Sequence, residues 1–558
     1  MRAERGLALG VVALATLAVL PLAAIVIRGF APGAGATWSH LASTVLGTYA
    51  GNTLALVVMV GLGVAFGGTA AGWLVARRTF PGSSVFAWAL LLPLAMPAYV
   101  MAYAYTDFLE YAGPLQSALR TLFGWRHEDY WFPDVRSLPG AAAMLTFTLY
   151  PYVYLLARTA FVERSPSLVE AARTMGLDAR ATFWRVELPL ARPAIAGGVA
   201  LALMETLADF GTVAYFGIDT LTTGIYRTWF TLGDRAAAAQ LATALLALTV
   251  AALVLERASR GAARTSTGAR GHAGASTRPA LRGLRAAAAT GVCTIAVAVG
   301  FALPVALLLR LIALEPALAV DPRFGQWIWN SLRVAALAAL LAVAAAMLAA
   351  YAVRLDRGRW TRASARVLTL GYAVPGTVLA IGVLLPLGGI DAWLADLARR
   401  GGDPRPGLLL TGTVVALIYA YVVRYFAVAW NGIEPGLARI TPAMDAASRS
   451  LGSGAGATFA RVHAPLLARS TAAALLLVFV DVMKELPATL VLRPFNFETL
   501  ATQTFQLTRD ERLTEAALPS LAMVVVGLVP IVMLARAARR TVASRRGTAA
   551  PATTIASA

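Results

Sequence analysis

Long apolar stretches alternate with short polar ones along nearly the whole chain. Twelve of the apolar stretches reach the roughly 20 residues that a helix needs to cross a bilayer. Their apolarity is nearly continuous, which favours membrane-spanning helices because barrel strands would alternate in polarity. The pattern therefore predicts an all-α polytopic membrane protein. The expected spans are Leu7–Ile27, Thr53–Ala76, Val85–Phe108, Gly140–Phe161, Arg192–Phe216, Ala236–Leu255, Ala286–Ile312, Asn330–Val353, Val367–Leu387, Gly407–Trp430, Ser470–Leu492 and Ala516–Ala535.

A polar stretch rich in glycine, alanine and serine divides the chain after the sixth expected span. It runs from Glu256 to Pro279 and lacks apolar periodicity, as a flexible linker does. The chain should therefore fall into two halves of six spans. We expect a first half at 1–256, a cytoplasmic linker at 257–285, a second half at 286–546 and a disordered tail at 547–558.

The two halves look like copies of one unit. The stretch "GNTLALV" from Gly51 corresponds to "WNSLRVA" from Trp329, and Pro97 corresponds to Pro375. Because each half has an even number of spans, both insert with the same orientation. The sequence therefore predicts two pseudo-symmetric six-helix halves, related by an axis along the membrane normal.

The composition and the placement of arginine agree with this fold class. Hydrophobic residues make up 58% of the chain and charged residues 14%, against about a quarter charged in soluble domains. A net charge of +19 is typical of nucleic-acid binding, but here the arginines lie in loops beside the expected spans, as the positive-inside rule requires. This placement predicts cytoplasmic termini and no nucleic-acid partner. A cleaved signal in place of the first span is the alternative, given the small residues of "APGAGA".

Two polar segments stand at matched places, after the fourth and the tenth expected spans. "EAARTMGLDARATFWRVELP" begins at Glu170, and "AASRSLGSGAGATFARVHAP" begins at Ala446. In both, a glycine lies thirteen residues before a proline, where it permits the left-handed turn that ends a helix. We expect a helix–turn–helix along the cytoplasmic surface in each, within 163–190 and 432–466.

These segments resemble the EAA loops of bacterial ABC-importer permeases. The second copy is degenerate, because Ala446 stands at the glutamate position, with Asp445 one residue earlier, and Ala464 stands at the leucine position. In that family the loop forms a coupling helix that docks into a separate ATPase subunit. The resemblance implies two ABC ATPase subunits and a periplasmic substrate-binding protein as partners. The matching positions are Glu170, Ala171, Ala172, Gly176, Val186, Leu188 and Pro189 in the first copy, and Ala447, Gly452, Val462 and Pro465 in the second.

The chain itself lacks the motif for ATP hydrolysis. A phosphate-binding loop needs a lysine after a glycine-rich turn, and the only lysine, Lys484, lies in "DVMKELP". The single cysteine, Cys293, excludes a disulfide framework and a Cys-based metal site. We therefore expect a transport subunit of the bacterial inner membrane that is not an enzyme and needs no cofactor.

Two stretches are similar to fused twelve-span permeases for ferric iron. They are "ETLADFGTVAYFGIDTLTTGIYRTWF" from Glu205 and "KELPATLVLRPFNFETLATQTFQLTRDERLTEAALPSL" from Lys484. Fused permeases for thiamine or phosphonates share this architecture, so those substrates stay open. A different class, the ion-coupled secondary transporter, also often has twelve spans in two repeated halves. The paired coupling loops argue against that class.

Four acids lie inside the expected spans. Glu205 and Asp209 are four residues apart on the fifth span, hence on one helical face, and Asp481 and Glu485 repeat this on the eleventh. Charges within spans usually face the bundle interior or an aqueous path, and a ferric ion suits carboxylate ligands. Either the four acids line a translocation path, or they pair with cations and hold the fold. The candidate cations are Lys484 and Arg192.

Overall fold

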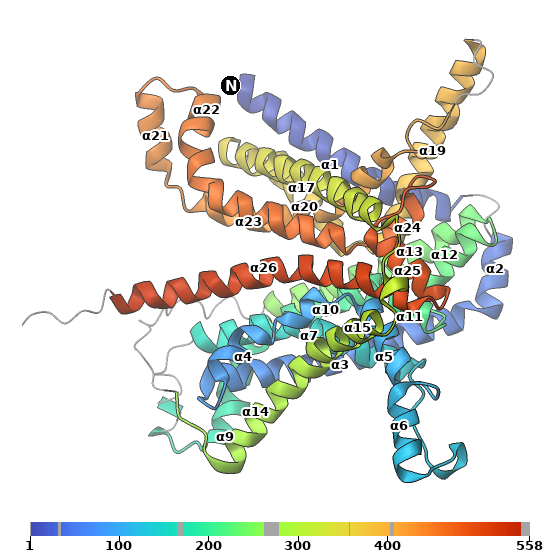
Figure 1. Cartoon of the computed structure of the whole chain (residues 1–558). Helices are drawn as coiled ribbons and strands as arrows, with labels where there is room; N and C mark the ends of the chain where they lie inside the picture. The colour runs from blue at the N-terminus through green and yellow to red at the C-terminus, as the bar shows by residue number, and fades with distance from the viewer. Residues whose placement is uncertain are drawn as a thin grey trace, which may run out of the picture.

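The computed structural model is a bundle of helices, and it describes residues 2–31, 35–163, 171–172, 174–261, 278–356, 358–401 and 407–547 (Figure 1). The helices of residues 2–261 are α1 (Arg2–Gly29), α2 (Gly35–Thr44), α3 (Leu46–Arg77), α4 (Ser83–Ala89), α5 (Ala98–Leu109), α6 (Pro114–Phe123), α7 (Leu138–Glu163), α9 (Ala179–Thr182), α10 (Leu188–Ala208), α11 (Gly211–Tyr215), α12 (Leu221–Phe230) and α13 (Arg235–Gly261). Those of residues 283–547 are α14 (Gly283–Val297), α15 (Leu303–Leu314), α16 (Pro316–Ala319), α17 (Phe324–Leu355), α18 (Arg359–Leu368), α19 (Gly376–Arg400), α20 (Val414–Ala438), α21 (Pro442–Ser450), α22 (Ala455–Thr458), α23 (Ala464–Met483), α24 (Pro487–Leu492), α25 (Leu500–Arg509) and α26 (Leu513–Gly547). Short 3-10 turns (Leu92–Ala95, His127–Asp129, Thr369–Ala373) and π turns (Phe183–Glu187, Ala298–Ala302, Phe459–His463) lie between some of them.

The predicted all-α polytopic fold is confirmed. In the described part of the chain, eleven helices are long and apolar enough to cross a membrane. A bent pair, Ser83–Ala95 with Ala98–Phe123, makes a twelfth span if its two members are counted as one. These helices follow the apolar stretches because a backbone inside a bilayer must satisfy its own hydrogen bonds.

Four of the expected spans are broken rather than continuous. The third and ninth are interrupted just before Pro97 and Pro375, and α23 ends shortly before Pro487 begins α24. Proline lacks an N–H donor and disfavours a helical conformation in the residue before it, so it interrupts a helix at these places. The fifth span breaks without proline, between Ala208 and Gly211. The broken spans leave polar backbone and side chains at their breaks.

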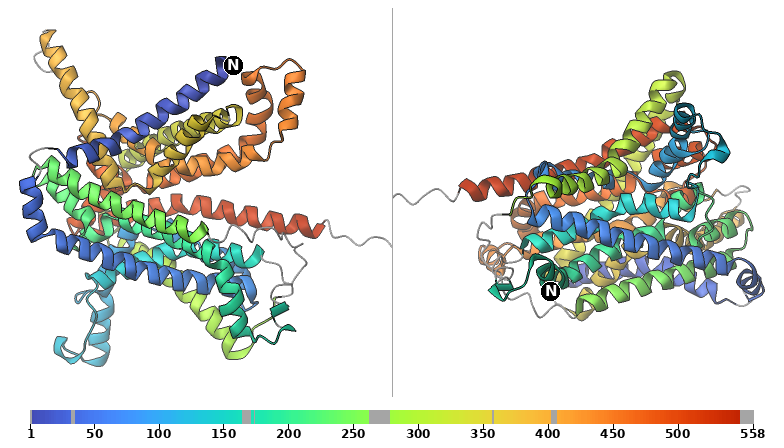
Figure 2. Two further views of the ribbon diagram at one scale, coloured as in Figure 1. Left: turned by 180° about the vertical axis from the view of Figure 1, so that it is seen from behind. Right: turned by 90° about the horizontal axis from the view of Figure 1, so that it is seen from below.

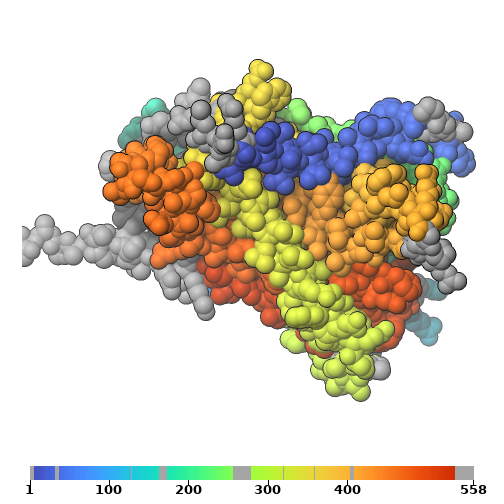
Figure 3. Space-filling model, turned by 90° about the horizontal axis from the view of Figure 1, so that it is seen from above, coloured from blue at the N-terminus to red at the C-terminus, as the bar shows by residue number. Residues whose placement is uncertain are grey.

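The first helices of each half of the chain pack against the other half. The helix α1 packs against α17, α18 and α19 of the second half, as well as against α13. In return, α15 packs against α5, and α14 packs against α3 and α4. Figure 3 shows α1 (dark blue) lying along the yellow and orange helices of the second half. The two halves are therefore interlocked and do not sit simply side by side.

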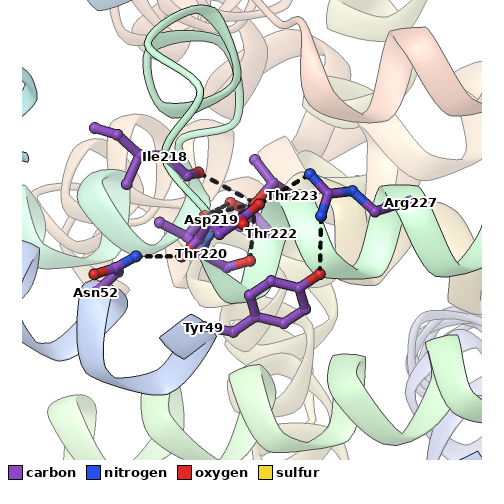
Figure 4. A network of polar contacts seen from close by, with 8 residues as sticks. All are labelled: Tyr49, Asn52, Ile218, Asp219, Thr220, Thr222, Thr223 and Arg227. Atoms are coloured by element: carbon purple, nitrogen blue, oxygen red, sulfur yellow. Dashed lines mark hydrogen bonds and ion pairs between the residues drawn. The ribbon is translucent and has the colours of Figure 1, made fainter. Parts of the chain in front are cut away.

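The repeat that was read from "GNTLALV" and "WNSLRVA" has a structural counterpart. The Asn52 side chain donates to the backbone oxygen of Asp219 at 2.8 Å, and Asn330 donates to that of Glu498 at 3.0 Å. The next residue in each copy, Thr53 or Ser331, accepts from the amide that begins α12 or α25. Figure 4 shows the first of these networks. The same hydrogen bonds thus hold α12 and α25 to the outer ends of α3 and α17.

Different helices form the two ends of the bundle. The helices α9, α21 and α22 lie at the same end as the beginning of α1 and the end of α26 (Figure 2). At the opposite end lie α2, α12, α6 and the last turns of α19 (Figures 1 and 2). The segments that resemble coupling loops therefore share one end of the molecule.

Candidate functional site

The four broken spans meet around a cavity between the two halves. Its volume is about 160 Å³, and it is lined by the residues at the breaks of the third, fifth, ninth and eleventh spans. All four acids that the sequence singled out line this cavity. Its charged and phenolic lining residues are Glu205, Asp209, Asp481, Glu485, Arg424, Lys484, Tyr99, Tyr152, Tyr372 and Tyr425.

Two of the four acids are bonded to the short helices that follow the breaks. The Asp209 carboxylate accepts from the Thr212 hydroxyl at 2.9 Å and from the Val213 amide at 3.2 Å. The Glu485 carboxylate accepts from the amides of Ala488 and Thr489, at 2.9 and 3.0 Å. Backbone amides at the start of a helix would otherwise lack partners, and they favour a negative charge. These two carboxylates therefore hold α11 and α24 in place.

The other two acids have fewer bonds of this kind. Glu205 accepts from the hydroxyl of Tyr372 at 2.8 Å, a bond that joins the first half to the second. In the part of the chain that the structure describes, no group donates a hydrogen bond to the carboxylate of Asp481. Within each pair, the acid that comes first in the sequence, Glu205 or Asp481, therefore remains more available to a ligand in the cavity.

Of the two expected cations, Lys484 lines the cavity and Arg192 does not. Lys484 donates to the backbone oxygen of Leu94 at 3.1 Å and so also bridges the halves. Arg192 does not line the cavity; it lines a separate apolar groove beside α3 and α10. Arg424, on α20, lies 3.6 Å from Glu485 and is buried. Sequence reasoning missed Arg424, although an arginine inside the apolar run "YVVRYFA" was a usable signal.

The charges in the cavity do not balance. Four carboxylates face two cationic side chains, so acids are in excess by two. Two nitrogen atoms of the buried Arg424 guanidinium, Nε and Nη1, have no hydrogen-bond partner. Among the described residues, no three His, Cys, Asp or Glu side chains are grouped closely enough to hold a metal ion. The cavity is therefore rich in carboxylates that face one another across the two halves.

The tyrosines near this region have separate roles. Of the tyrosines in the fourth and tenth expected spans, Tyr152 and Tyr425 line the cavity. Tyr154 donates to the backbone oxygen of Ala87 at 3.0 Å, and Tyr421 contacts the Thr489 hydroxyl. These two phenols therefore belong to the packed core around the cavity.

The two loops resembling EAA motifs contain the left-handed turns expected of them. Gly176 has φ 85° and Gly452 has φ 78°, values that glycine adopts without a steric penalty. Ala171 is exposed and Ala172 is buried, whereas Glu170 lies outside the described residues. After each turn, a short helix continues through a π turn directly into the next span, which has Pro189 or Pro465 in its first turn. The π turns contain Val186 and Val462, and the spans begin at Leu188 and Ala464.

The second loop is tied to the bundle by an acid. The Asp445 carboxylate lies 2.9 Å from Arg354 and 2.7 Å from Nε2 of His463, which is buried. Arg354 also donates to the backbone oxygens of Leu437 and Ile440. Partial burial raises the pKa of Asp445, but the hydrogen bonds from His463 and Arg354 outweigh it and hold the pKa below its usual value. The acid nearest the degenerate glutamate position is therefore engaged within the chain, whereas Ala447 of the same helix is exposed.

The first loop is attached by a different acid. Glu187, at the end of its π turn, accepts from the indole N–H of Trp73 at 2.7 Å and lies 2.9 Å from Arg77. It occupies the place that His463 occupies in the second loop, at the end of the matching π turn. The two loops thus share a backbone shape but not an anchoring chemistry.

Comparison with known proteins shows which family the chain belongs to. Residues 63–260 match the family described as the binding-protein-dependent transport system inner membrane component. The chain is also 31% identical over 244 residues to the probable molybdenum ABC transporter permease protein of Haloferax volcanii, covering 43% of this chain and 84% of that protein. The chain belongs to this permease family. It is the transmembrane permease subunit of an ABC importer, a multi-pass protein of the inner membrane type.

Other relatives of the permease differ in length. An Fe(3+)-transport system permease protein of Haemophilus influenzae is 25% identical over 490 residues, which cover 87% of this chain and 88% of that protein. A molybdenum transport system permease protein of Escherichia coli is 29% identical over 210 residues, 37% of this chain and 86% of that protein. The ferric relative therefore matches both halves of the permease, whereas the molybdenum relatives match less than half of it.

Proposed function

We propose that this permease moves ferric iron, delivered by a periplasmic binding protein and driven by a separate ATPase. The observation that supports ferric iron as the substrate is the surplus of carboxylates in the central cavity. A surplus of carboxylates attracts a cation and repels an oxyanion, and hard oxygen ligands suit ferric iron. The full-length match to a relative named for Fe(3+) transport supports the same choice.

Within this proposal the four acids divide into two roles. Glu205 and Asp481 form the path, because their carboxylates have the fewest internal partners. Asp209 and Glu485 keep the breaks open by holding α11 and α24. The ion is passed between carboxylates of the two halves and is not held in a closed coordination shell, which agrees with the lack of a three-ligand group among the described residues.

The coupling loops form the other functional surface of the proposal. Two ATPase subunits dock at them, one at the loop within 163–190 and the other at the loop within 432–466. Glu170 in the first loop offers a carboxylate to its ATPase, whereas the second docks through shape alone, because Asp445 is engaged by Arg354. The loops and both termini face the cytoplasm, with the halves at 1–256 and 286–546.

Uptake by the reconstituted system tests the substrate. The permease, its ATPase and its binding protein are placed in liposomes, and entry of radioactive ferric iron is measured for Glu205→Gln and Asp481→Asn. We expect each variant to lose most of its uptake while ATPase subunits still bind. Glu315→Gln is the matched control, because Glu315 is an exposed acid away from the cavity. Wild-type entry of thiamine but not of iron, or full uptake by the double variant, would reject the proposal.

Labelling of two exposed residues tests the orientation. Met175 is 74% exposed in the first coupling loop and Phe495 is 94% exposed at the other end of the bundle. In whole cells, a membrane-impermeant maleimide should label Phe495→Cys and leave Met175→Cys unlabelled. Inverted membrane vesicles should give the opposite result. Labelling of Met175→Cys from outside intact cells contradicts cytoplasmic coupling loops.

A further inference from the structure

Two arms project from opposite edges of the bundle, at the end away from the coupling loops (Figure 1). The first arm is residues 110–137, which include α6. The second arm is residues 390–401 and 407–413, which include the last turns of α19. The first arm joins the third span to the fourth and the second joins the ninth to the tenth, so the arms occupy matching places in the two halves.

The first arm has its polar side chains on the inside. Gln116 is 6% exposed, and its amide donates to the backbone oxygen of Leu109 and accepts from the Tyr130 hydroxyl, both at 2.7 Å. Arg120 donates to the same hydroxyl at 3.0 Å, and its guanidinium lies 4.0 Å from the centre of the Tyr111 ring. The inner side of this arm is therefore a hydrogen-bonded polar network.

Several large apolar side chains of the first arm are exposed, alongside exposed charged ones. Leu122 is 75% exposed, Phe123 is 55% exposed and Trp131 is 83% exposed. At 100° per residue, Leu115, Leu119 and Leu122 fall on one face of α6, and Gln116 and Arg120 fall on a neighbouring one. Gln116 is turned inward, whereas Leu122 and Phe123 at the end of the helix are turned outward.

The second arm repeats this arrangement with an unrelated sequence. Asp391 is 2% exposed and accepts from the amides of Leu409, Leu410 and Thr411, at 3.1, 2.9 and 2.8 Å. The large apolar side chains of the arm are exposed, with Trp393 at 64% and Leu409 at 61%. In this arm a buried carboxylate, in place of the buried amide of the first arm, holds the segment together while Trp393 and Leu409 are exposed.

Large apolar side chains that stay exposed beside a polar interior suit surroundings that are not water alone. Exposed apolar patches mark contact with a membrane or a partner, and an amphipathic helix in the plane of a membrane buries its apolar face at the boundary of headgroups and acyl chains. Tryptophan is enriched at that depth. The helical segment Ala98–Phe123, which ends in the first arm, is bent by 91° from Ser83–Ala95 at the break beside Pro97.

We propose that both arms lie on the surface of the bilayer, in the leaflet away from the coupling loops, with their apolar faces in the acyl boundary. The arms project from opposite edges of the bundle, so one partner seated over its middle would not cover both (Figure 1). A lipid surface surrounds the bundle and reaches both at once. In this position each arm fixes the depth of the two spans that it connects.

Site-specific fluorescence tests this placement on the full chain. An environment-sensitive dye is attached at Leu122→Cys, with Thr121→Cys as the matched control on another face of α6. Leu397→Cys and Arg399→Cys form the corresponding pair on the second arm. The native Cys293 is 0% exposed and stays unlabelled, which labelling of the unaltered chain verifies. All four positions are at or near the surface, so the substitutions should leave the fold intact, as a single symmetric gel-filtration peak would show.

The permease is reconstituted in vesicles of phosphatidylethanolamine and phosphatidylglycerol, with or without bromine on the acyl chains. We expect brominated lipid to quench the dye at residues 122 and 397 severalfold more than at 121 and 399, and aqueous iodide to show the reverse order. Equal iodide quenching within each pair, with no effect of bromine, overturns the proposal. Protection of residues 122 and 397 from iodide only when the binding protein is added also overturns it, and assigns the arms to that partner.

Discussion

At the scale of single residues, the cavity separates two kinds of carboxylate that look alike in sequence. Glu485 accepts hydrogen bonds from two amides and from the Thr489 hydroxyl, whereas Asp481, one turn earlier, has no such partner among the described residues. Glu485→Gln should lower the free energy of unfolding by roughly 1–3 kcal/mol, because an amide leaves one of the buried donors without an acceptor. Thermal denaturation in detergent measures this loss.

The matched variant is Asp481→Asn, which should keep the melting temperature of the unaltered permease while uptake falls. Equal destabilisation by the two variants would show that both carboxylates hold the fold. No change in melting temperature for Glu485→Gln would mean that α24 does not depend on that carboxylate.

The limits of sequence reasoning are also clearest at this scale. The spacing of Glu205 and Asp209 correctly placed both acids at one site, because a helix brings residues four apart to one face. It did not reveal that Asp209 turns to the amides of α11, because the break after Ala208 has no proline to mark it. Arg424 has no counterpart in the other half, so the repeat gave no reason to expect it.

At the scale of elements, the coupling loops depend on a turn that only glycine makes without strain. Gly176→Val should place a β-branched residue at φ 85°, where an L side chain is strained by about 1–2 kcal/mol or more. Among the described residues, no atom lies within 4 Å of an added Cβ there, so the strain comes from the backbone. Uptake and ATPase binding should fall while membrane insertion persists. Co-purification of the ATPase with the permease measures the effect.

The control for this variant is Gly456→Val, in the second loop. Gly456 also has open space around it among the described residues, but its φ is not positive. The two variants therefore add the same side-chain volume, and only Gly176→Val strains the backbone. If Gly456→Val impairs ATPase binding as strongly as Gly176→Val, the left-handed turn is not the cause. Both glycine turns were predictable, since glycine is the residue that such a turn requires.

At the scale of the whole molecule, the first helices of each half pack on the other half and so join the two. The helix α1 packs on α18 and α19, and α15 packs on α5 and α26. Residues 1–261 and 278–558, produced as two separate chains, should therefore assemble, co-purify and support uptake. Affinity purification through a tag on one chain measures this assembly.

The same experiment with α1 removed from the first chain is the control, because it deletes the contacts of α1 with the second half and leaves those of α14 and α15 with the first half. Recovery of the second chain should then drop. Equal recovery with and without α1 contradicts a role for the exchange in holding the halves together. Sequence could not have predicted this exchange, because apolarity identifies a span but carries no information about its neighbour.

Because both halves belong to one polypeptide, each molecule carries one copy of each coupling loop. A pair of identical subunits related by a twofold axis must present the same surface twice, so a change in one loop changes both. Here the loop within 163–190 and the loop within 432–466 are encoded separately, and Asp445 and Glu187 secure them by different contacts. The two loops can therefore change independently in sequence, because a substitution in one leaves the other unaltered.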